Sequence, residues 1–220
     1  VQFIEELQSQ PIAVQTEAAN EQHYELPPEF FEKILGRNLK YSCCYWSDDL
    51  SYKKLKKDPN LEQRLDQAED EMLKLTAARA EIENGQNILE LGCGWGSLSF
   101  YLARKYPDSR IISMSNSKDQ INYINQLAAA NKVDNLRAVK ADINNFQTEA
   151  KFDRIISIEM FEHLRNYKKL MEKLSSFLRA EGKLFVHIFS HKYYPFIYQD
   201  KKNGDWMSRY FFSGGTMPSQ

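Results

Sequence analysis

A glycine-rich stretch constrains the fold of this chain more than any other feature. The run NILELGCGWGSLSFYLARKY, residues 87–106, joins an apolar strand pattern to a helical pattern through three alternate glycines. The first glycine permits a sharp turn, the second lets a ligand approach the backbone, and the third allows close packing of helix and strand. Such a turn, with Glu90 two residues ahead of it, is typical of a nucleotide-like cofactor site. Its GxGxG spacing leaves open whether that cofactor is a dinucleotide or S-adenosylmethionine.

Strand and helix patterns alternate from Gly85 onward. The strand patterns cover residues 87–92, 110–115, 136–142, 152–158 and 183–189, with helical periodicity between most of them. This alternation predicts an α/β fold: a doubly wound parallel sheet with helices on both faces. The strand order that we expect for it is 3-2-1-4-5, one of the orders that such sheets adopt. Ligands of such sheets bind at the carboxyl ends of the strands, where the strand order reverses.

The first part of the chain has a different pattern. A short helix is expected over Pro27–Gly36 and a long one over about Asn60–Glu83. We therefore expect residues 1–84 to form a helical segment whose helices, with a covering loop, close over the cofactor. Residues 85–220 are expected to form a Rossmann-like core. The chain begins without methionine and ends abruptly in GGTMPSQ, so we expect both ends to be incomplete.

Composition excludes several classes of protein. The net charge is −1 and no polybasic tract occurs, which argues against a nucleic-acid partner. No apolar run approaches the roughly 20 residues of a transmembrane helix, although a peripheral membrane contact is left open. Three cysteines without a CxxC pattern, and scattered histidines, predict neither a disulfide framework nor a metal site. A cytoplasmic location fits these features, and the oligomeric state is not indicated.

The residues at the end of the second strand narrow the choice of cofactor. A dinucleotide site usually places a carboxylate there to bind the ribose hydroxyls. In this chain the strand ends in SMSNSKDQ, residues 113–120, with no acid at the strand end itself. Ser115 and Gln120 are the side chains that could bind a ribose instead.

Several strings together resemble one superfamily. ELGCGWGSLS resembles the first motif of class I S-adenosylmethionine-dependent methyltransferases. The strings YSCCYW (41–46), SMSNSKDQ and EMFEHLRNY (159–167) resemble motifs of the cyclopropane fatty acid synthase-like family, and DWMSRYFFSGGTMPS (205–219) is also similar. EMFEHLRNY is especially close to the plant coclaurine-type N-methyltransferases of the same superfamily.

This resemblance implies a cofactor site for S-adenosylmethionine, with S-adenosylhomocysteine as product. Tyr41, Ser42, Gly92 and Gly94 would approach its methionine part. Glu90 belongs to the same motif, and Ser115 and Gln120 would hold the ribose. Asp142 would lie beside the adenine, with a helix cap as the alternative role of this residue.

The string EMFEH carries the chemistry expected at the acceptor. Glu159, Glu162 and His163 follow a buried strand, where the substrate would meet the cofactor. An amine must reach the methyl group neutral, and a carboxylate or histidine can accept its proton and attract its cation. We therefore expect Glu162 to act as general base or cation anchor, assisted by Glu159 and His163.

The cyclopropane synthase branch implies another acceptor. There Cys43, Glu162 and His187 match positions that hold a bicarbonate ion, which acts as the base, and the acceptor is an alkene. Phe189 stands where those synthases usually have isoleucine. Taken alone, His187 in its apolar strand fits a buried core residue better than a functional one. Cys43 is expected near the methyl group without acting as a nucleophile. The sequence thus favours methylation of a small or amphipathic amine, with an unsaturated acyl lipid as the alternative substrate and a non-enzymatic nucleotide-binding module as the alternative function.

Overall fold

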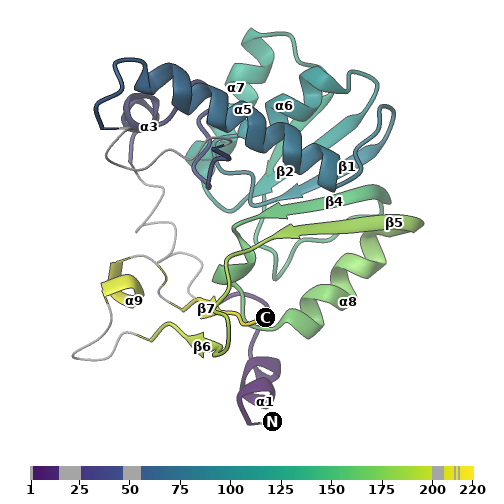
Figure 1. Ribbon diagram of the computed structural model, residues 1–220. Helices are drawn as coiled ribbons and strands as arrows, with labels where there is room; N and C mark the ends of the chain where they lie inside the picture. Colours follow the sequence, from purple (N-terminus) through teal and green to yellow (C-terminus); the bar gives the residue numbers. More distant parts are fainter. Residues whose placement is uncertain (1, 15–25, 47–55, 200–205, 211, 213) are drawn as a thin grey trace.

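A five-stranded parallel sheet forms the centre of the computed structural model, which describes residues 2–14, 26–46, 56–199, 206–210, 212 and 214–220. The strand order is β3-β2-β1-β4-β5, as the sequence predicts (Figure 1). The strands are β1 (Asn87–Leu91), β2 (Arg110–Ser115), β3 (Leu136–Lys140), β4 (Phe152–Ile158) and β5 (Leu178–His187). β1 pairs with β2 on one side and with β4 on the other, so the order reverses at β1.

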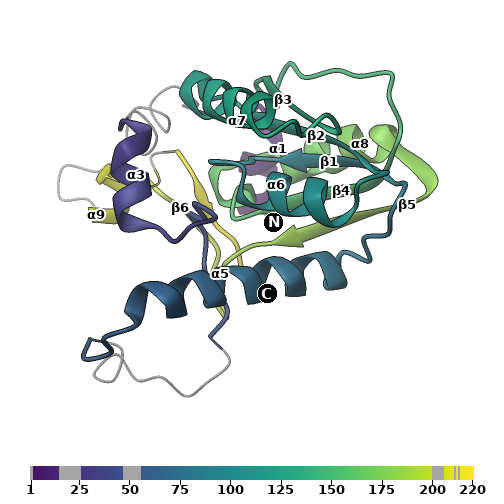
Figure 2. The same cartoon turned by 90° about the horizontal axis from the view of Figure 1, so that it is seen from above.

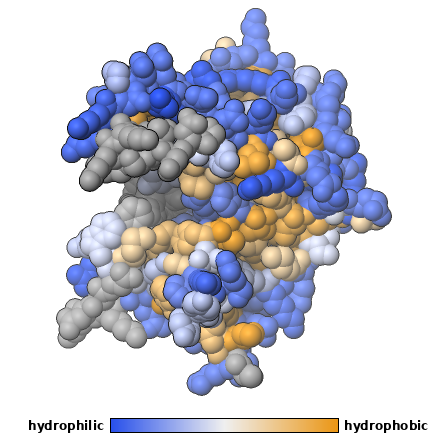
Figure 3. All heavy atoms as spheres, in the orientation of Figure 1, coloured by the Kyte–Doolittle hydropathy of each residue, from blue (hydrophilic) through white to orange (hydrophobic). Residues whose placement is uncertain are grey.

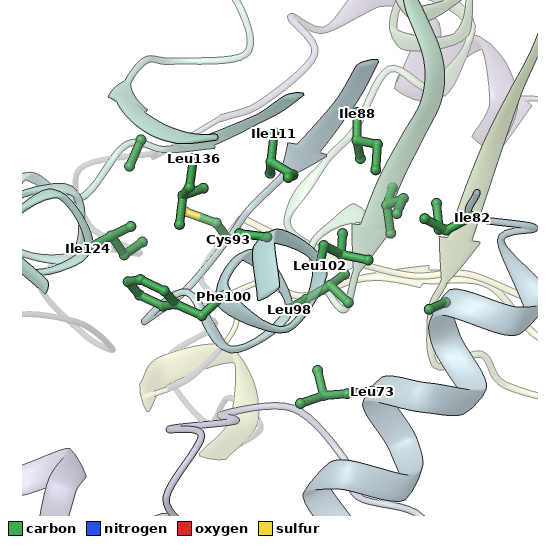
Figure 4. Packing of buried hydrophobic residues seen from close by; sticks show 14 of the residues in the cluster. Leu73, Ile82, Ile88, Cys93, Leu98, Phe100, Leu102, Ile111, Ile124 and Leu136 are labelled. Atoms are coloured by element: carbon green, nitrogen blue, oxygen red, sulfur yellow. The ribbon is translucent and has the colours of Figure 1, made fainter. Parts of the chain in front are cut away.

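Helices cover both faces of this sheet. The helices α6 (Ser97–Lys105) and α7 (Lys118–Ala130) pack on one face, and α8 (Tyr167–Phe177) packs on the other. Successive residues of β1 divide between the two cores because side chains alternate along a strand. Ile88 joins the cluster under α6 and α7 (Figure 4), whereas Leu89 and Leu91 join the cluster under α8. Burial on both faces explains why the strands appear in the sequence as continuous apolar runs.

The helices of the first part of the chain lie on opposite sides of the core. The helix α1 (Gln2–Ser9) lies against α8, where Asn166 Nδ2 donates to the carbonyl of Gln8 at 2.7 Å. In contrast, α3 (Pro28–Ile34) and α5 (Leu61–Arg79) are on the side of α6, and α5 runs alongside it (Figure 2). Both α3 and α5 match the helices that the sequence predicts. The expectation that the N-terminal helices close over the cofactor site therefore does not extend to α1.

The aromatic segment after β5 forms short elements. It contains β6 (Phe196–Ile197), α9 (Trp206–Tyr210) and β7 (Thr216–Met217), and β6 pairs antiparallel with β7. Phe212 stacks on Tyr198 with ring centroids 5.2 Å apart and contacts Phe189 beyond β5. Asp205, Phe211 and Ser213 of the similar C-terminal string lie outside the described residues. None of the described helices is long and apolar enough to cross a membrane.

Gly96, the third glycine of the turn, packs against a neighbouring helix. It precedes α6 with φ of 87°, and a Cβ atom there would lie 2.8 Å from Cγ1 of Ile124 in α7. Gly85 has nearly the same φ, 88°, but a Cβ atom there would meet no atom within 4 Å. A substitution at each of these two glycines therefore separates the energetic cost of a left-handed backbone from the cost of steric overlap.

We expect Gly96→Ala to destabilise the protein more than Gly85→Ala. Both changes carry the left-handed backbone cost of about 1–2 kcal/mol. Only Gly96→Ala adds overpacking against Ile124, which costs about a further 1–3 kcal/mol. Urea unfolding of both variants measures the difference. Equal free energies of unfolding would show that Ile124 moves aside without cost.

Candidate active site

A cavity of about 410 Å³ opens at the carboxyl ends of β1, β2 and β4. All eight residues that the sequence assigns to the cofactor line it: Tyr41, Ser42, Glu90, Gly92, Gly94, Ser115, Gln120 and Asp142. Glu159 and His163 of the expected acceptor site line the same cavity, but Cys43, Glu162 and His187 do not form its wall. Figure 3 shows an apolar band across the middle of one face of the molecule, between more hydrophilic parts.

The glycine turn is tied to the end of the neighbouring strand. The backbone amides of Gly92 and Cys93 both donate to the carbonyl of Met114, at 2.9 and 3.0 Å. Gly92 has φ of 73°, and a Cβ atom there would lie 2.7 Å from Cγ of Met160. Gly94 has φ of 53° and no atom within 4 Å of its missing side chain, so its backbone is open to the cavity that it lines. These two glycines meet the requirements predicted for a cofactor turn.

Glu90 is a buried carboxyl group beneath the turn. It accepts hydrogen bonds from the hydroxyls of Ser99 and Ser113, the latter at 3.0 Å. Burial raises the pKa of Glu90 to about 7, although both hydrogen bonds oppose this shift. Its charge therefore changes near neutral pH, at the floor of the cavity.

The cavity wall after β2 and β3 carries unsatisfied polar groups. The Ser115 hydroxyl donates to Oε1 of Gln120 at 2.8 Å, which fixes the orientation of that amide. Among the described residues, Nε2 of Gln120 has no hydrogen-bond partner although it is buried. Asp142 accepts the backbone amide of Asn144 at 2.8 Å and so closes a turn, not the first turn of a helix. These groups are suited to bind the hydroxyls and ring of a nucleoside.

A lysine that the sequence does not single out supports the loop over the cavity. Lys40 is 4% exposed, and its ammonium donates to the hydroxyl of Ser42 at 2.5 Å and to the carbonyl of Cys43 at 2.8 Å. Desolvation by burial lowers the pKa of Lys40. Tyr41 packs edge-to-face on Phe31 of α3, with centroids 5.4 Å apart. The position of Lys40 directly before the YSCCYW string is the sequence signal from which its role in holding this loop could have been predicted.

Glu159 meets Cys43 and His187 at the acceptor end. Glu159 has φ of 48°, its amide donates to the carbonyl of His187 at 2.8 Å, and its Oε1 accepts the amide of Cys43 at 3.0 Å. Cys43 Sγ lies 3.7 Å from Nε2 of His187. Desolvation and a hydrogen bond to Glu159 raise the pKa of Cys43 to about 11, so it is a thiol at neutral pH. A protonated thiol is a poor nucleophile, and the role of Cys43 stays a prediction.

Glu162, unlike Glu159, is a buried residue that does not line the cavity. It is fully buried in the 3₁₀ turn η1 (Phe161–His163), and its Oε1 accepts the amide of Phe189 at 2.9 Å. Its Oε2 has no hydrogen-bond partner among the described residues, and burial raises the pKa of Glu162 to about 7. Side-chain donor atoms of Cys43 and His187 group with Glu159, not with Glu162 as the synthase resemblance implies. The neighbouring His163 reaches the cavity wall beside Phe212.

Comparison with known proteins identifies the family of this chain. The model of the mycolic acid cyclopropane synthetase family matches residues 13–220. (S)-Coclaurine N-methyltransferase from Thalictrum flavum subsp. glaucum is 35% identical over 217 residues, which are 99% of this chain and 57% of that protein. Cyclopropane-fatty-acyl-phospholipid synthase from Escherichia coli (strain K12) is 28% identical over 200 residues, 90% of this chain and 46% of that protein.

The solved structures include a near neighbour. A crystal structure of coclaurine N-methyltransferase bound to N-methylheliamine and SAH (S-adenosylhomocysteine) matches with a TM-score of 0.87 and 34% identity. The match covers 99% of this chain and 60% of that one, so the chain spans less than two thirds of these relatives. The fold is that of the class I methyltransferases. The chain belongs to the mycolic acid cyclopropane synthetase family.

We expect the stability of the protein to reveal the buried carboxyl of Glu90. Its folded pKa of about 7 exceeds the ordinary value of 4.5, so its contribution to stability is complete below pH 4.5 and is lost as the pH rises through 7. The loss is on the order of 3 kcal/mol. Urea unfolding is measured at pH 5 and pH 8 in the wild type and in Glu90→Gln. Because glutamine cannot ionise, the difference between the two proteins gives the contribution of Glu90 ionisation to the free energy of unfolding. Parallel pH profiles for the two proteins would contradict the assignment.

Proposed function

We propose that this protein transfers a methyl group from S-adenosylmethionine to a small or amphipathic amine. One observation carries the proposal: the glycine turn and two residues after β4, Glu159 and His163, line a single cavity. A donor bound at the turn and an acceptor bound at Glu159 would thus share one space. Methyl transfer is an in-line displacement, so alignment of donor and acceptor supplies much of the catalysis.

The cofactor half of the proposal rests on the polar groups around the turn. The unpartnered Nε2 of Gln120 is a donor for a ribose hydroxyl, and Gly94 leaves room for close approach. The carboxylates of Glu90 and Asp142 in the wall suit the cationic and hydrogen-bonding parts of S-adenosylmethionine. The solved coclaurine N-methyltransferase bound to SAH supports this choice of cofactor.

The acceptor half rests on Glu159, Glu162 and His163. Glu159 lines the cavity and supplies a carboxylate that attracts an ammonium ion. Glu162 is buried and does not line the cavity, but its neighbour His163 does. With a pKa near 7 and one oxygen that has no hydrogen-bond partner among the described residues, Glu162 is suited to accept the proton that the amine must lose. Relatives named as N-methyltransferases, 35% and 34% identical to this chain, support an amine acceptor.

An unsaturated acyl lipid is the alternative acceptor. The contact between Cys43 and His187 favours it, because these positions match the bicarbonate site of the synthases, and Phe189 and Phe212 make the adjoining wall apolar. Against it, Glu162 lies apart from that pair and the synthase relatives are less similar, at 28% identity. A non-enzymatic nucleotide-binding module would not need the acidic residues in the cavity.

All three cysteines are free thiols, which supports a reducing compartment such as the cytoplasm.

We expect Glu162→Gln to lower kcat/KM for amine methylation by about 10²–10⁴-fold, because it removes the proton acceptor. In the wild type, kcat/KM rises with pH through about 7 as Glu162 ionises, and the variant loses this limb. Methylation assays from pH 5.5 to 8.5 measure both effects, and calorimetry with S-adenosylhomocysteine tests whether the cofactor site is intact.

The exposed glutamate Glu172 of α8 provides a matched control, and Glu172→Gln should leave rate and pH profile unchanged. Full activity of Glu162→Gln would exclude the role of Glu162. Tight binding of NAD by the wild type, with none of S-adenosylhomocysteine, would overturn the methyltransferase proposal itself.

A second experiment identifies the acceptor. The protein is incubated with methyl-labelled S-adenosylmethionine and two separate pools, one of amines and one of unsaturated phospholipids. We expect label in the amine pool, because Glu159 and His163 form the polar part of the acceptor wall. Label in phospholipid alone would establish the alternative acceptor.

A further inference from the structure

We infer that Cys43, Glu159 and His187 form a binding site for a zinc-class divalent cation at the acceptor end of the cavity. One donor atom from each residue lies within 4.8 Å of the other two. The three residues come from separate parts of the chain: the loop before α5, the end of β4 and the end of β5. No spacing in the sequence indicates such a site, which is why the sequence predicts none.

The distances suit a tetrahedral ion. With Zn–S near 2.3 Å and Zn–N near 2.0 Å, a tetrahedral site separates sulfur and nitrogen by about 3.5 Å. Cys43 Sγ and His187 Nε2 are 3.7 Å apart, so these two ligands need almost no movement. Thiolate, imidazole and a single carboxylate favour zinc or cobalt over magnesium and calcium, which require several oxygen ligands.

The backbone holds the three ligands in place before any ion arrives. β4 and β5 pair in parallel up to Ile158 and His187, and the Glu159 amide donates to the His187 carbonyl at 2.8 Å. The left-handed backbone of Glu159, with φ of 48°, directs its carboxylate to the Cys43 amide, 3.0 Å away. Sites supported by rigid elements in this way lose little entropy on binding.

Ion binding has a consequence for catalysis. Thiolate and carboxylate together balance the two charges of the ion, and three protein ligands leave a fourth position for water or an inhibitor. Because the ion takes the carboxylate of Glu159, it removes the group proposed to attract the amine. We therefore expect zinc to inhibit methylation reversibly. This consequence rests on the proposed function, whereas ion binding itself does not.

Cobalt(II) titration of the chelator-treated protein tests the site directly. We expect one cobalt ion per chain with a thiolate-to-cobalt charge-transfer absorption, and displacement of cobalt by zinc. Cys43→Ser should abolish that absorption. Loss of an outer-shell partner alone costs about 10–100-fold in affinity, so loss of a ligand in Cys43→Ser or His187→Asn should weaken zinc binding by at least about 100-fold.

Cys44→Ser is the matched control, because Cys44 lies in the same loop but outside the group of donor atoms. It should keep the absorption and the zinc affinity of the wild type. An absorption that survives Cys43→Ser, or is lost in Cys44→Ser, would overturn the site, as would equal zinc affinities of wild type and His187→Asn. These readouts need no substrate, so they separate failure of the ion site from failure of the proposed function.

Discussion

One carbonyl oxygen supports the geometry of the whole site. The carbonyl of Met114, at the end of β2, accepts the amides of Gly92 and Cys93 at 2.9 and 3.0 Å. These hydrogen bonds turn the chain sharply at the end of β1, where the strand order reverses. Because parallel strands end at the same edge, the turn faces the ends of β2 and β4 across one cavity. The sharp turn requires the positive φ of Gly92, so the glycine spacing is a consequence of this interaction.

Buried carboxyl groups hold the walls of this cavity in place. Glu69 of α5, which is fully buried, accepts the amides of Gly36 and Asn38, each at 2.9 Å, and so fixes the start of the loop that carries Tyr41. Glu162 accepts the amide of Phe189 in the same way. A buried carboxyl is costly unless it is hydrogen-bonded, so each such contact is a specific attachment of a loop to the core. Desolvation raises the pKa of Glu69 and Glu162 alike, which links loop attachment to proton binding.

The sequence predicts what local pattern and parallel topology determine. The parallel sheet follows from the alternation of strands and helices. Ser115 and Gln120 meet because Ser115 ends β2 and Gln120, five positions later, lies in the first turn of α7. Contacts between segments distant in the sequence cannot be predicted from local pattern. Nothing in the pattern of α5 distinguishes the buried Glu69 from the half-buried acids around it, and nothing in residues 2–9 indicates that α1 packs on α8. These contacts are determined by tertiary packing, which has no local signal in the sequence.

The backbone angle φ of Glu159 explains why the two glutamates of EMFEH have different surroundings. A continued strand would alternate side chains between faces, but the φ of 48° at Glu159 ends that alternation directly after β4. Glu159 consequently turns toward Cys43 and the cavity, while the chain enters η1 and carries Glu162 into the interior against Phe189. A non-glycine residue with positive φ is strained, and such strain is retained where the surrounding contacts enforce it. The hydrogen bond from the Glu159 amide to the His187 carbonyl is one of these contacts. The separation of an accessible carboxylate from a buried one is therefore built into the end of β4.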